Sequence, residues 1–175
     1  LRFGFDQSIG GEIVMTSSHL PDFGNLGSGD QAQTAIGQST LLVTPMHMAM
    51  LAAAFAHGGI VMKPYLVQEV VTPNGLVVHK ASPEKWLTVT TESMADKIHE
   101  FMEDVVTKGT GKAAQVSGVE VAGKTGTAEN PHGEDHAWFI GSAKLRNRNI
   151  AFAIIVENGG GGGKAAAPIA RKIIL

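Results

Sequence analysis

Apolar residues recur at helical spacing between residues 44 and 59, and residues that start and stop helices flank this run. Thr44 can cap a helix with its hydroxyl, and Pro45 suits the first helical position because an N–H there would find no partner. Gly58 and Gly59 follow the run and are typical of a helix end. The apolar stripe consists of Met46, Met50, Leu51, Ala54 and Phe55. This spacing, with many alanines between, predicts a helix packed in the core.

A second helix is predicted from Thr91 to Thr107, the most clearly amphipathic part of the chain. Its apolar stripe consists of Met94, Ile98, Phe101, Met102, Val105 and Val106. Charged residues occupy the opposite face, as is typical of a helix on the surface. Lys108 and Gly109 predict the end of this helix, and residues 109–114 are expected to form a loop.

Alternating apolar patterns predict strands in two regions. Valines and leucines between Tyr65 and His79 flank the turn sequence Pro73-Asn74-Gly75, which predicts a β-hairpin. Further along, strands are predicted at 119–127, 137–144 and 149–157, with a polar turn between the first two. Because short turns join antiparallel strands, we expect a three-stranded antiparallel meander here.

The two ends of the chain show weaker patterns. Residues from Leu1 to Gly37 are rich in Gly, Ser, Asp and Pro, so irregular structure is expected there. The glycines 159–163 predict a mobile connection to a short final helix at Ala165–Leu175, with Pro168 near its first turn. Helices, then strands, then a helix predict an α+β fold in which helices pack on an antiparallel sheet.

Composition narrows the function without identifying it. With 175 residues, 43% of them hydrophobic, the chain can bury one core, so one domain or the larger part of one is expected. The net charge of −2 gives no basic surplus, so no nucleic-acid partner is expected. The absence of cysteine excludes disulfides and thiolate metal sites. The longest apolar stretch, Met48–Ala56, is too short to cross a bilayer, which takes about 20 residues.

The segment Lys124-Thr125-Gly126-Thr127 carries the candidate chemistry. Strand residues alternate between faces, so Lys124 and Gly126 are expected on one face and the two threonines on the other. At a sheet edge, the free backbone of such a strand can bind a peptide as an added strand. Glycine permits close approach, lysine supplies positive charge, and threonine hydroxyls can bind a terminal carboxylate. The segment therefore predicts a peptide-binding cleft.

Other segments match binding motifs only in part. A phosphate-binding loop needs a first glycine and a hydroxyl residue after Gly-Lys, and both are missing around Gly111-Lys112 and Gly163-Lys164. The segment His132–His136 holds several potential ligands, but a metal site needs at least three that converge, and this segment lies in a predicted turn without a distant partner. We expect no metal and no cofactor, with incidental surface affinity for metal as the alternative at 132–136.

Several blocks of the sequence, in a fixed order, resemble the C-terminal half of the transpeptidase domain of class B penicillin-binding proteins. They are Phe3-Gly4-Phe5, Ala35–Ser39, Val43–Ala49, Ala52–Gly59, Lys63–Val67, Val121–Ala128 and His136–Gly141. Their order is more specific than the Lys-Thr-Gly motif alone. The resemblance implies that residues 1–175 are the C-terminal portion of a single α+β domain of the penicillin-binding and β-lactamase-like kind.

The resemblance also implies parts that this chain does not supply. The family uses a Ser-x-x-Lys nucleophile and a Ser-x-Asn motif, both N-terminal to this region, and the chain contains no Ser-x-Asn. Its one Ser-x-x-Lys, Ser82–Lys85, has a polar approach and no apolar helical stripe after it. We interpret Ser82 as a helix N-cap with Pro83 at the first position. The chain is therefore expected to be an inactive fragment without its nucleophile.

By resemblance, the intact protein cross-links peptidoglycan stem peptides as a D,D-transpeptidase and binds β-lactam antibiotics. Lys124 and Thr127 are implied to be catalytic, the lysine through its charge and proton network and the Thr127 N–H as an oxyanion donor. Lys124, Thr125, Gly126 and Thr127 are implied to bind the substrate. The resemblance further implies cell-division or elongation proteins as partners, and an extracytoplasmic location with an N-terminal membrane anchor outside this chain.

Three alternatives stay open. A β-lactamase or β-lactam sensor also carries Lys-Thr-Gly, although the Gly37-Gln38 and Thr44-Pro45 blocks look like the synthetic enzymes. A noncatalytic relative that binds peptides along the strand 121–127 is the second. The third is a structural subdomain with an exposed cleft. Because loss of the N-terminal half would uncover apolar surface, we expect a homodimer of this chain at high concentration.

Overall fold

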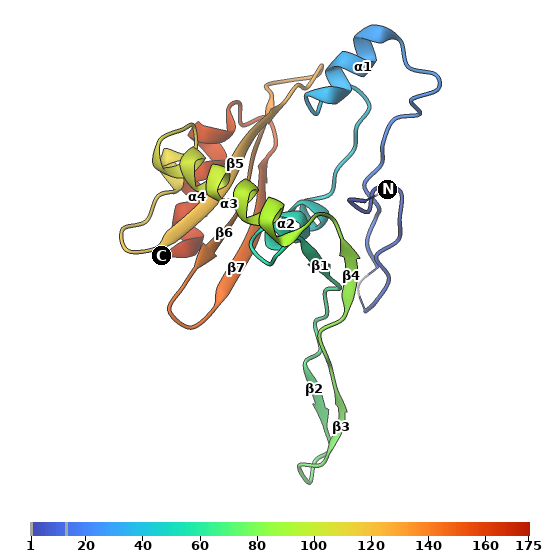
Figure 1. The fold of residues 1–175 in the computed structure, drawn as a ribbon, viewed down its shortest axis with the longest axis vertical. Coiled ribbons are helices and arrows are strands. Elements are labelled where there is room, and N and C mark those ends of the chain that lie inside the picture. Colours follow the sequence, from blue (N-terminus) through green and yellow to red (C-terminus); the bar gives the residue numbers. More distant parts are fainter. Residues whose placement is uncertain (1, 13) are drawn as a thin grey trace.

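The computed structural model describes residues 2–12 and 14–175, and a three-stranded antiparallel sheet forms its centre (Figure 1). The strands are β5 (Glu120–Ala128), β6 (His136–Lys144) and β7 (Asn149–Val156), in the order β5-β6-β7. The register pairs Lys124 with Ile140. The predicted meander and α+β class are confirmed. β5 is an edge strand, since among the described residues β6 alone pairs with it.

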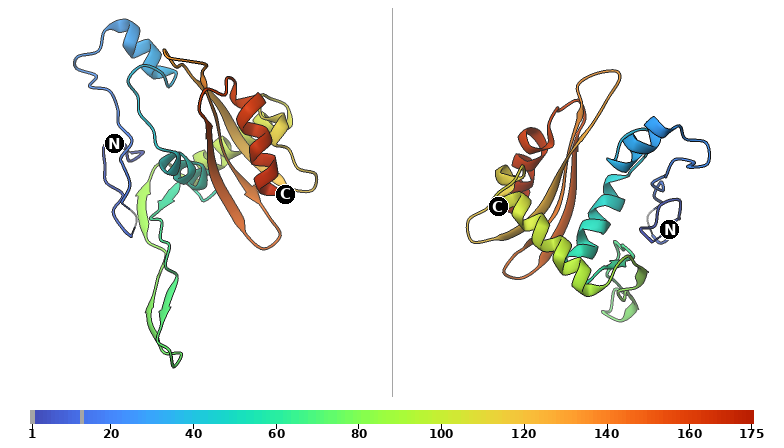
Figure 2. Two further views of the ribbon diagram at one scale, coloured as in Figure 1. Left: turned by 180° about the vertical axis from the view of Figure 1, so that it is seen from behind. Right: turned by 45° about the horizontal axis from the view of Figure 1, so that its top comes forward.

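Helices cover both faces of this sheet (Figure 2). α4 (Gly162–Ile174) packs on one face together with the short 3₁₀ helix η1 (Lys112–Ala114). α2 (Pro45–Phe55) packs on the opposite face against β6 and β7, and α3 (Glu92–Thr107) runs along β5. The edge strand that carries the Lys-Thr-Gly motif is therefore held by helices on two sides.

The main hydrophobic core lies between α4 and the sheet. Phe139 of β6 is fully buried there and stacks on Phe152 of β7 with ring centroids 6.1 Å apart. α4 presents buried alanines to this core, which lets the helix approach the strands closely. A second core surrounds α2 and a two-stranded sheet of β1 (Ile60–Met62) and β4 (Lys85–Thr88).

α2 begins where the sequence predicts. The Thr44 hydroxyl accepts a hydrogen bond from the His47 N–H at 3.3 Å, as expected of an N-cap. Most of the predicted stripe is buried or half-buried, but Met46 is 37% exposed, so the prediction is wrong at that position. The His47 ring takes an inward position instead: it is 1% exposed and hydrogen-bonds to the Phe3 carbonyl at 2.7 Å.

α3 also begins as predicted, with the Thr91 hydroxyl accepting a hydrogen bond from the Met94 N–H at 3.4 Å. Its predicted apolar stripe is only partly right. Val106 is buried, whereas Met94 and Phe101 are 53% and 58% exposed. The buried face of α3 is therefore narrower than the apolar stripe in the sequence indicates. Lys97 partly covers the exposed Phe101 ring, with its Nζ 5.4 Å from the ring centroid.

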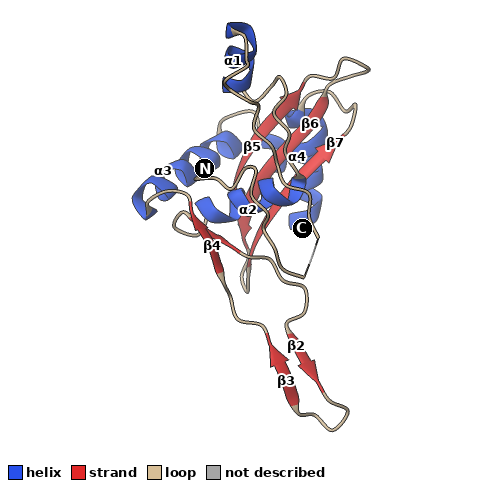
Figure 3. Cartoon of the chain, turned by 90° about the vertical axis from the view of Figure 1, so that its right-hand side faces the viewer, coloured by secondary structure: helices blue, strands red, loops and turns tan. Residues whose placement is uncertain are grey.

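The predicted hairpin is present as β2 (Glu69–Val71) and β3 (Val77–Lys80), which pair antiparallel around the turn at 73–75. Every residue of both strands is exposed. The hairpin projects from the body of the molecule at the end opposite α1 (Ser28–Ala35), as Figure 3 shows.

The N-cap interpretation of Ser82 is wrong. No helix begins at this position in the described part of the chain. Lys85 instead opens β4 and pairs with Met62 of β1, so pairing between strands takes the place of a helical turn. A serine here therefore has no lysine one helical turn away.

α1 is a helix that the sequence did not predict, because residues 1–37 were expected to be irregular. It has no buried residue and therefore no apolar stripe that a pattern could reveal. Outside α1, an isolated bridge between His19 and Leu42 ties this segment to the chain before α2. Leu1 and Ile13 lie outside the described residues.

α4 begins earlier than predicted. Gly162 and Gly163 form its first turn, so the expected mobile connection is wrong for these two glycines. Pro168 consequently lies inside the helix and not near its first turn. The N–H of Gly160 donates to the carbonyl of Asp135 at 2.8 Å, which ties the connection to the turn between β5 and β6.

Candidate active site

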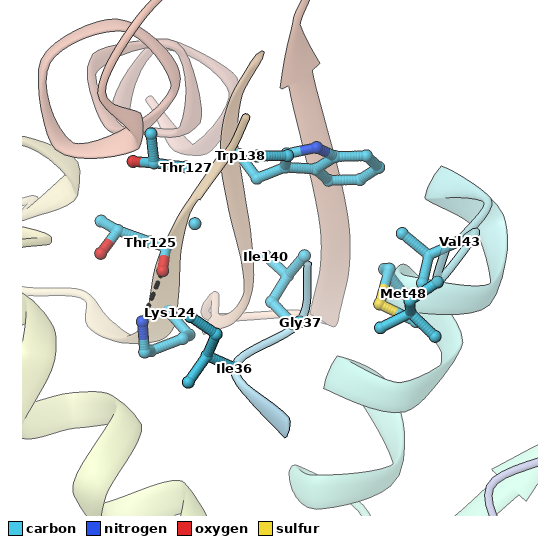
Figure 4. A pocket seen from close by; sticks show the side chains of 12 residues that line it. Ile36, Gly37, Val43, Met48, Lys124, Thr125, Thr127, Trp138 and Ile140 are labelled. Atoms are coloured by element: carbon cyan, nitrogen blue, oxygen red, sulfur yellow. Dashed lines mark hydrogen bonds between the residues drawn. The ribbon is translucent and has the colours of Figure 1, made fainter. Parts of the chain in front are cut away.

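A cavity of about 540 Å³ lies between β5, β6 and the segment that joins α1 to α2 (Figure 4). Its apolar wall includes Trp138 and Ile140 from β6 and Met48 from α2. Its polar wall is β5, where Lys124, Thr125, Gly126 and Thr127 all line the cavity. The structure thus brings the sequence-predicted residues to one site.

The motif residues alternate between the two faces of β5. A Cβ on Gly126 would stand 3.1 Å from the Cβ of Trp138, its partner on β6. Thr125 turns to the opposite face, where its hydroxyl meets the Thr110 hydroxyl at 2.6 Å. Figure 4 shows Thr125 and Thr127 projecting away from the Trp138 ring. This is the alternation expected of a strand.

Lys124 places a positive charge beside the cavity. Its side chain is exposed, and its Nζ donates to the Thr125 carbonyl at 2.5 Å (Figure 4). An ammonium group carries three donors, so two remain for a ligand or solvent. Among the described residues, no carboxylate lies within ion-pair distance of this lysine. The charge is therefore free to attract an anionic group.

Thr110 is a site residue that sequence reasoning missed. It lies in the turn after α3, where Gly111 approaches the sheet so closely that a Cβ would be 3.1 Å from the Phe139 ring. Its hydroxyl holds the Thr125 hydroxyl in place. A threonine between two glycines is visible in the sequence, but its distance from Thr125 depends on how α3 packs on β5.

Gln38 is a second missed residue, although its block was part of the family resemblance. Its Nε2 donates to the Thr127 carbonyl at 3.0 Å, and its Oε1 accepts from the Glu129 N–H at 3.2 Å. These partners lie 89 and 91 residues further along the chain. No local pattern predicts so distant a contact.

The first turn of α4 packs directly behind the motif. A Cβ on Gly162 would collide with the carbonyl oxygens of Gly126 and Trp138 and would lie 3.1 Å from the Gly126 nitrogen. Only glycine permits this approach of helix to strand. β5 is therefore supported from behind at Gly126, while its outer edge stays open to the cavity.

Away from the cavity, one group of metal-ligating side chains comes together among the described residues. The ligand atoms of His99, Glu103 and Glu120 lie within 4.8 Å of one another. Burial raises the pKa of Glu103 above its usual value, the charge of His99 opposes this, and the nearby Glu120 adds to it. Ser142 hydrogen-bonds to His99 Nε2 at 3.2 Å. Residues 132–136 do not belong to this group, and the expectation of no metal stays a prediction.

Comparisons with known proteins agree with one another and cover most of the chain. The family described as "Penicillin binding protein transpeptidase domain" matches residues 1–175. The peptidoglycan D,D-transpeptidase PbpA of Mycobacterium tuberculosis is 36% identical over 170 residues, which cover 91% of this chain and 33% of that protein. The stage V sporulation protein D of Bacillus subtilis is 34% identical over 167 residues, which cover 89% of this chain and 25% of that protein. The chain thus spans a third or less of the length of these relatives.

Solved structures share the fold. The D,D-transpeptidase domain of a peptidoglycan glycosyltransferase from Eggerthella lenta matches with a TM-score of 0.87 and 31% identity, over 99% of this chain and 44% of that one. Penicillin-binding protein A from M. tuberculosis, solved as a ceftriaxone acyl-enzyme complex, matches with a TM-score of 0.87 and 31% identity, over 99% of this chain and 40% of that one.

Proposed function

The chain belongs to the penicillin-binding protein transpeptidase domain family, and from this premise we propose that the intact protein is a serine-type D,D-transpeptidase. Such an enzyme attacks the penultimate D-Ala carbonyl of a peptidoglycan stem peptide with a serine hydroxyl. The terminal D-Ala leaves, the peptide remains as a serine ester, and an amine of a second stem peptide then takes the acyl group. Relatives named as peptidoglycan D,D-transpeptidases favour this function over a β-lactamase or sensor.

The observation that carries the proposal is the placement of Lys-Thr-Gly-Thr on β5, an edge strand of the described sheet, beside a cavity of about 540 Å³. In this proposal Lys124 contributes positive charge and organises the proton network, while Thr125 and Thr127 bind the substrate carboxylate. The backbone N–H of Thr127 is one oxyanion donor. The stem peptide lies along the edge as an added strand, and Gly126 leaves room for it.

The serine nucleophile belongs, in this proposal, to a part of the protein outside residues 1–175, which form the C-terminal portion of one transpeptidase domain. Ser82–Lys85 does not fit the role, because Lys85 lies in β4. Losing one oxyanion donor alone typically costs about 10²–10³ in rate, and losing the nucleophile removes the covalent route. This chain alone is therefore inactive.

Partners and location follow from the same proposal. Acyl-enzyme complexes of the M. tuberculosis relative with β-lactams support β-lactam antibiotics as ligands of this protein. The proposed enzyme works outside the cytoplasm, is held at the membrane by an N-terminal anchor, and acts with cell-division or elongation proteins. Within the described residues, no helix combines the length and apolar character that a membrane span needs.

Acylation of the full-length protein by penicillin, together with D-Ala release from a stem peptide, tests the proposal. Lys124→Ala should lower both rates by more than about 10²-fold, because it removes the charge beside the reacting group. Lys144→Ala, at the end of the neighbouring strand β6, is the control and should leave both rates unchanged. Near-normal acylation of Lys124→Ala would remove Lys124 from the site. Peptide binding without acylation of the unsubstituted protein would favour a noncatalytic peptide-binding module.

A further inference from the structure

The backbone hydrogen bonds at the end of α1 place Gln38 beside β5. The Gly37 N–H donates to the Thr34 carbonyl at 3.0 Å, and the Gln38 N–H donates to the Gln33 carbonyl at 2.9 Å. These two bonds form a Schellman motif, which closes a helix and reverses the chain. Gly37 has a φ of +83°, which glycine adopts without strain. The backbone of Gln38 is therefore fixed by the helix end itself.

The Gln38 side chain bonds to the end of β5 and to the residue that follows it, as a neighbouring strand would. The Thr127 carbonyl and the Glu129 N–H belong to alternate residues, so both point to the same edge. A carbonyl and an N–H two residues further on are the pair that one residue of a parallel strand would bond. The carboxamide of Gln38 supplies both partners, with its Nε2 and its Oε1, at 3.0 and 3.2 Å. It thus closes the outer edge of β5 from the Thr127 carbonyl onward.

We propose that Gln38 is a positioning residue for the Lys-Thr-Gly-Thr edge, a role that rests on the proposed function. Because Gln38 binds the Thr127 carbonyl, the backbone of Thr127 keeps one orientation. The N–H of Thr127 therefore keeps its direction toward the cavity. The two bonds of Gln38 end the free edge at the Thr127 carbonyl, so that an added peptide aligns against residues 124–126 and the Thr127 N–H and does not slide further.

The orientation of Thr127 matters because an oxyanion donor stabilises charge only where it points at the reacting oxygen. A misplacement of about 1 Å can cost on the order of 10²-fold in rate. Gln38 is half-buried and makes only part of the restraint on β5, which also pairs with β6. We therefore expect a loss of about tenfold in the acylation step when its bonds are removed.

Three variants of the full-length protein isolate these bonds. Gln38→Met keeps the length and the apolar stem of the side chain but loses both hydrogen bonds. Gln38→Glu keeps an acceptor for the Glu129 N–H and loses the donor to Thr127. Gln33→Met makes the same change on α1 at an exposed side chain and serves as the matched control.

Rapid kinetics of acylation by penicillin separate the dissociation constant of the noncovalent complex from the first-order acylation rate. Gln38→Met and Gln38→Glu should both lower the acylation rate about tenfold relative to Gln33→Met, with the dissociation constant changed less than about twofold. The melting temperature should match the control. Hydrogen exchange at the Glu129 amide should be faster in Gln38→Met and stay slow in Gln38→Glu.

An acylation rate of Gln38→Met equal to that of Gln33→Met would overturn the positioning role. The positioning role would also be overturned if Gln38→Met had a lower melting temperature and the dissociation constant and the acylation rate changed by the same factor. Gln38 would then serve stability alone. If the unsubstituted protein is not acylated, the proposed function fails. Unchanged exchange at Glu129 in Gln38→Met, with normal acylation of the unsubstituted protein, refutes the contact itself and leaves the proposed function standing.

Discussion

Replacing Gly162 with alanine should destabilise the sheet at the candidate site. The added Cβ would collide with the carbonyl oxygens of Gly126 and Trp138 and come within 3.1 Å of the Gly126 nitrogen. All of these are backbone atoms of β5 and β6, which cannot rotate aside as a side chain can. The helix must therefore move away from the Lys-Thr-Gly strand, or the strand must bend.

The size of the effect follows from two opposing contributions. Overpacking a well-packed interior costs about 1–3 kcal/mol, and backbone collisions favour the upper end of this range. Alanine in place of glycine inside a helix returns up to about 1 kcal/mol. A net loss of about 2 kcal/mol remains, which lowers the melting temperature by about 4–8 °C for a chain of this size.

Gly161 offers a matched control one residue earlier. Its φ is −81°, and a Cβ added there meets no atom within 4 Å. Gly161 is the N-cap of α4, where alanine is less favourable than glycine, so Gly161→Ala should lose only about 0.5 kcal/mol. Thermal unfolding of both variants, followed by circular dichroism, measures the difference. If Gly162→Ala melts at the temperature of Gly161→Ala, the close packing of α4 on β5 does not constrain residue 162.

Two further predictions concern charge and association. The pKa of Glu103 is raised in the folded chain, so folding favours its protonated form. This protonated form therefore stabilises the fold at pH values below the pKa of Glu103 in the unfolded chain. The stabilisation is lost as the pH rises through the pKa of Glu103 in the folded chain. At pH 7, Glu103→Gln should therefore have a higher melting temperature than the unsubstituted chain. At or below about pH 4, the two melting temperatures should be equal. The same difference in melting temperature at both pH values would contradict this prediction. The chain should also dimerise at high concentration, because apolar residues of the hairpin such as Val71 and Leu76, which are 53% and 64% exposed, lie uncovered. Light scattering that reports a monomer at every concentration would refute that prediction.

Elements with local signals could be predicted from the sequence. Thr44 and Thr91 cap their helices as expected, because an N-cap hydroxyl bonds to an N–H only a few residues away. The hairpin follows from its turn sequence, and the meander from apolar alternation and short turns. The Lys-Thr-Gly-Thr residues were identified for the same reason, since their alternation on a strand is a local property.

Features that depend on distant contacts could not be predicted. α1 lacks an apolar stripe, and Gln38, which follows this helix, contacts Thr127 only through the tertiary fold. β4 forms because Lys85 pairs with Met62 of β1. This strand pairing overrides the helix start that Ser82 and Pro83 suggest. The role of Gly162 likewise appears only when α4 is placed against β5, because an isolated glycine run indicates flexibility and not close packing.

Mapping a penicillin adduct on the full-length protein is the most direct test of the proposed transpeptidase function. Intact mass measurement should show one penicilloyl group per molecule, and peptide mapping should place it on a serine outside residues 1–175, in a Ser-x-x-Lys at the start of a helix. An adduct on Ser82, or none at all under conditions where the protein is folded, would contradict it.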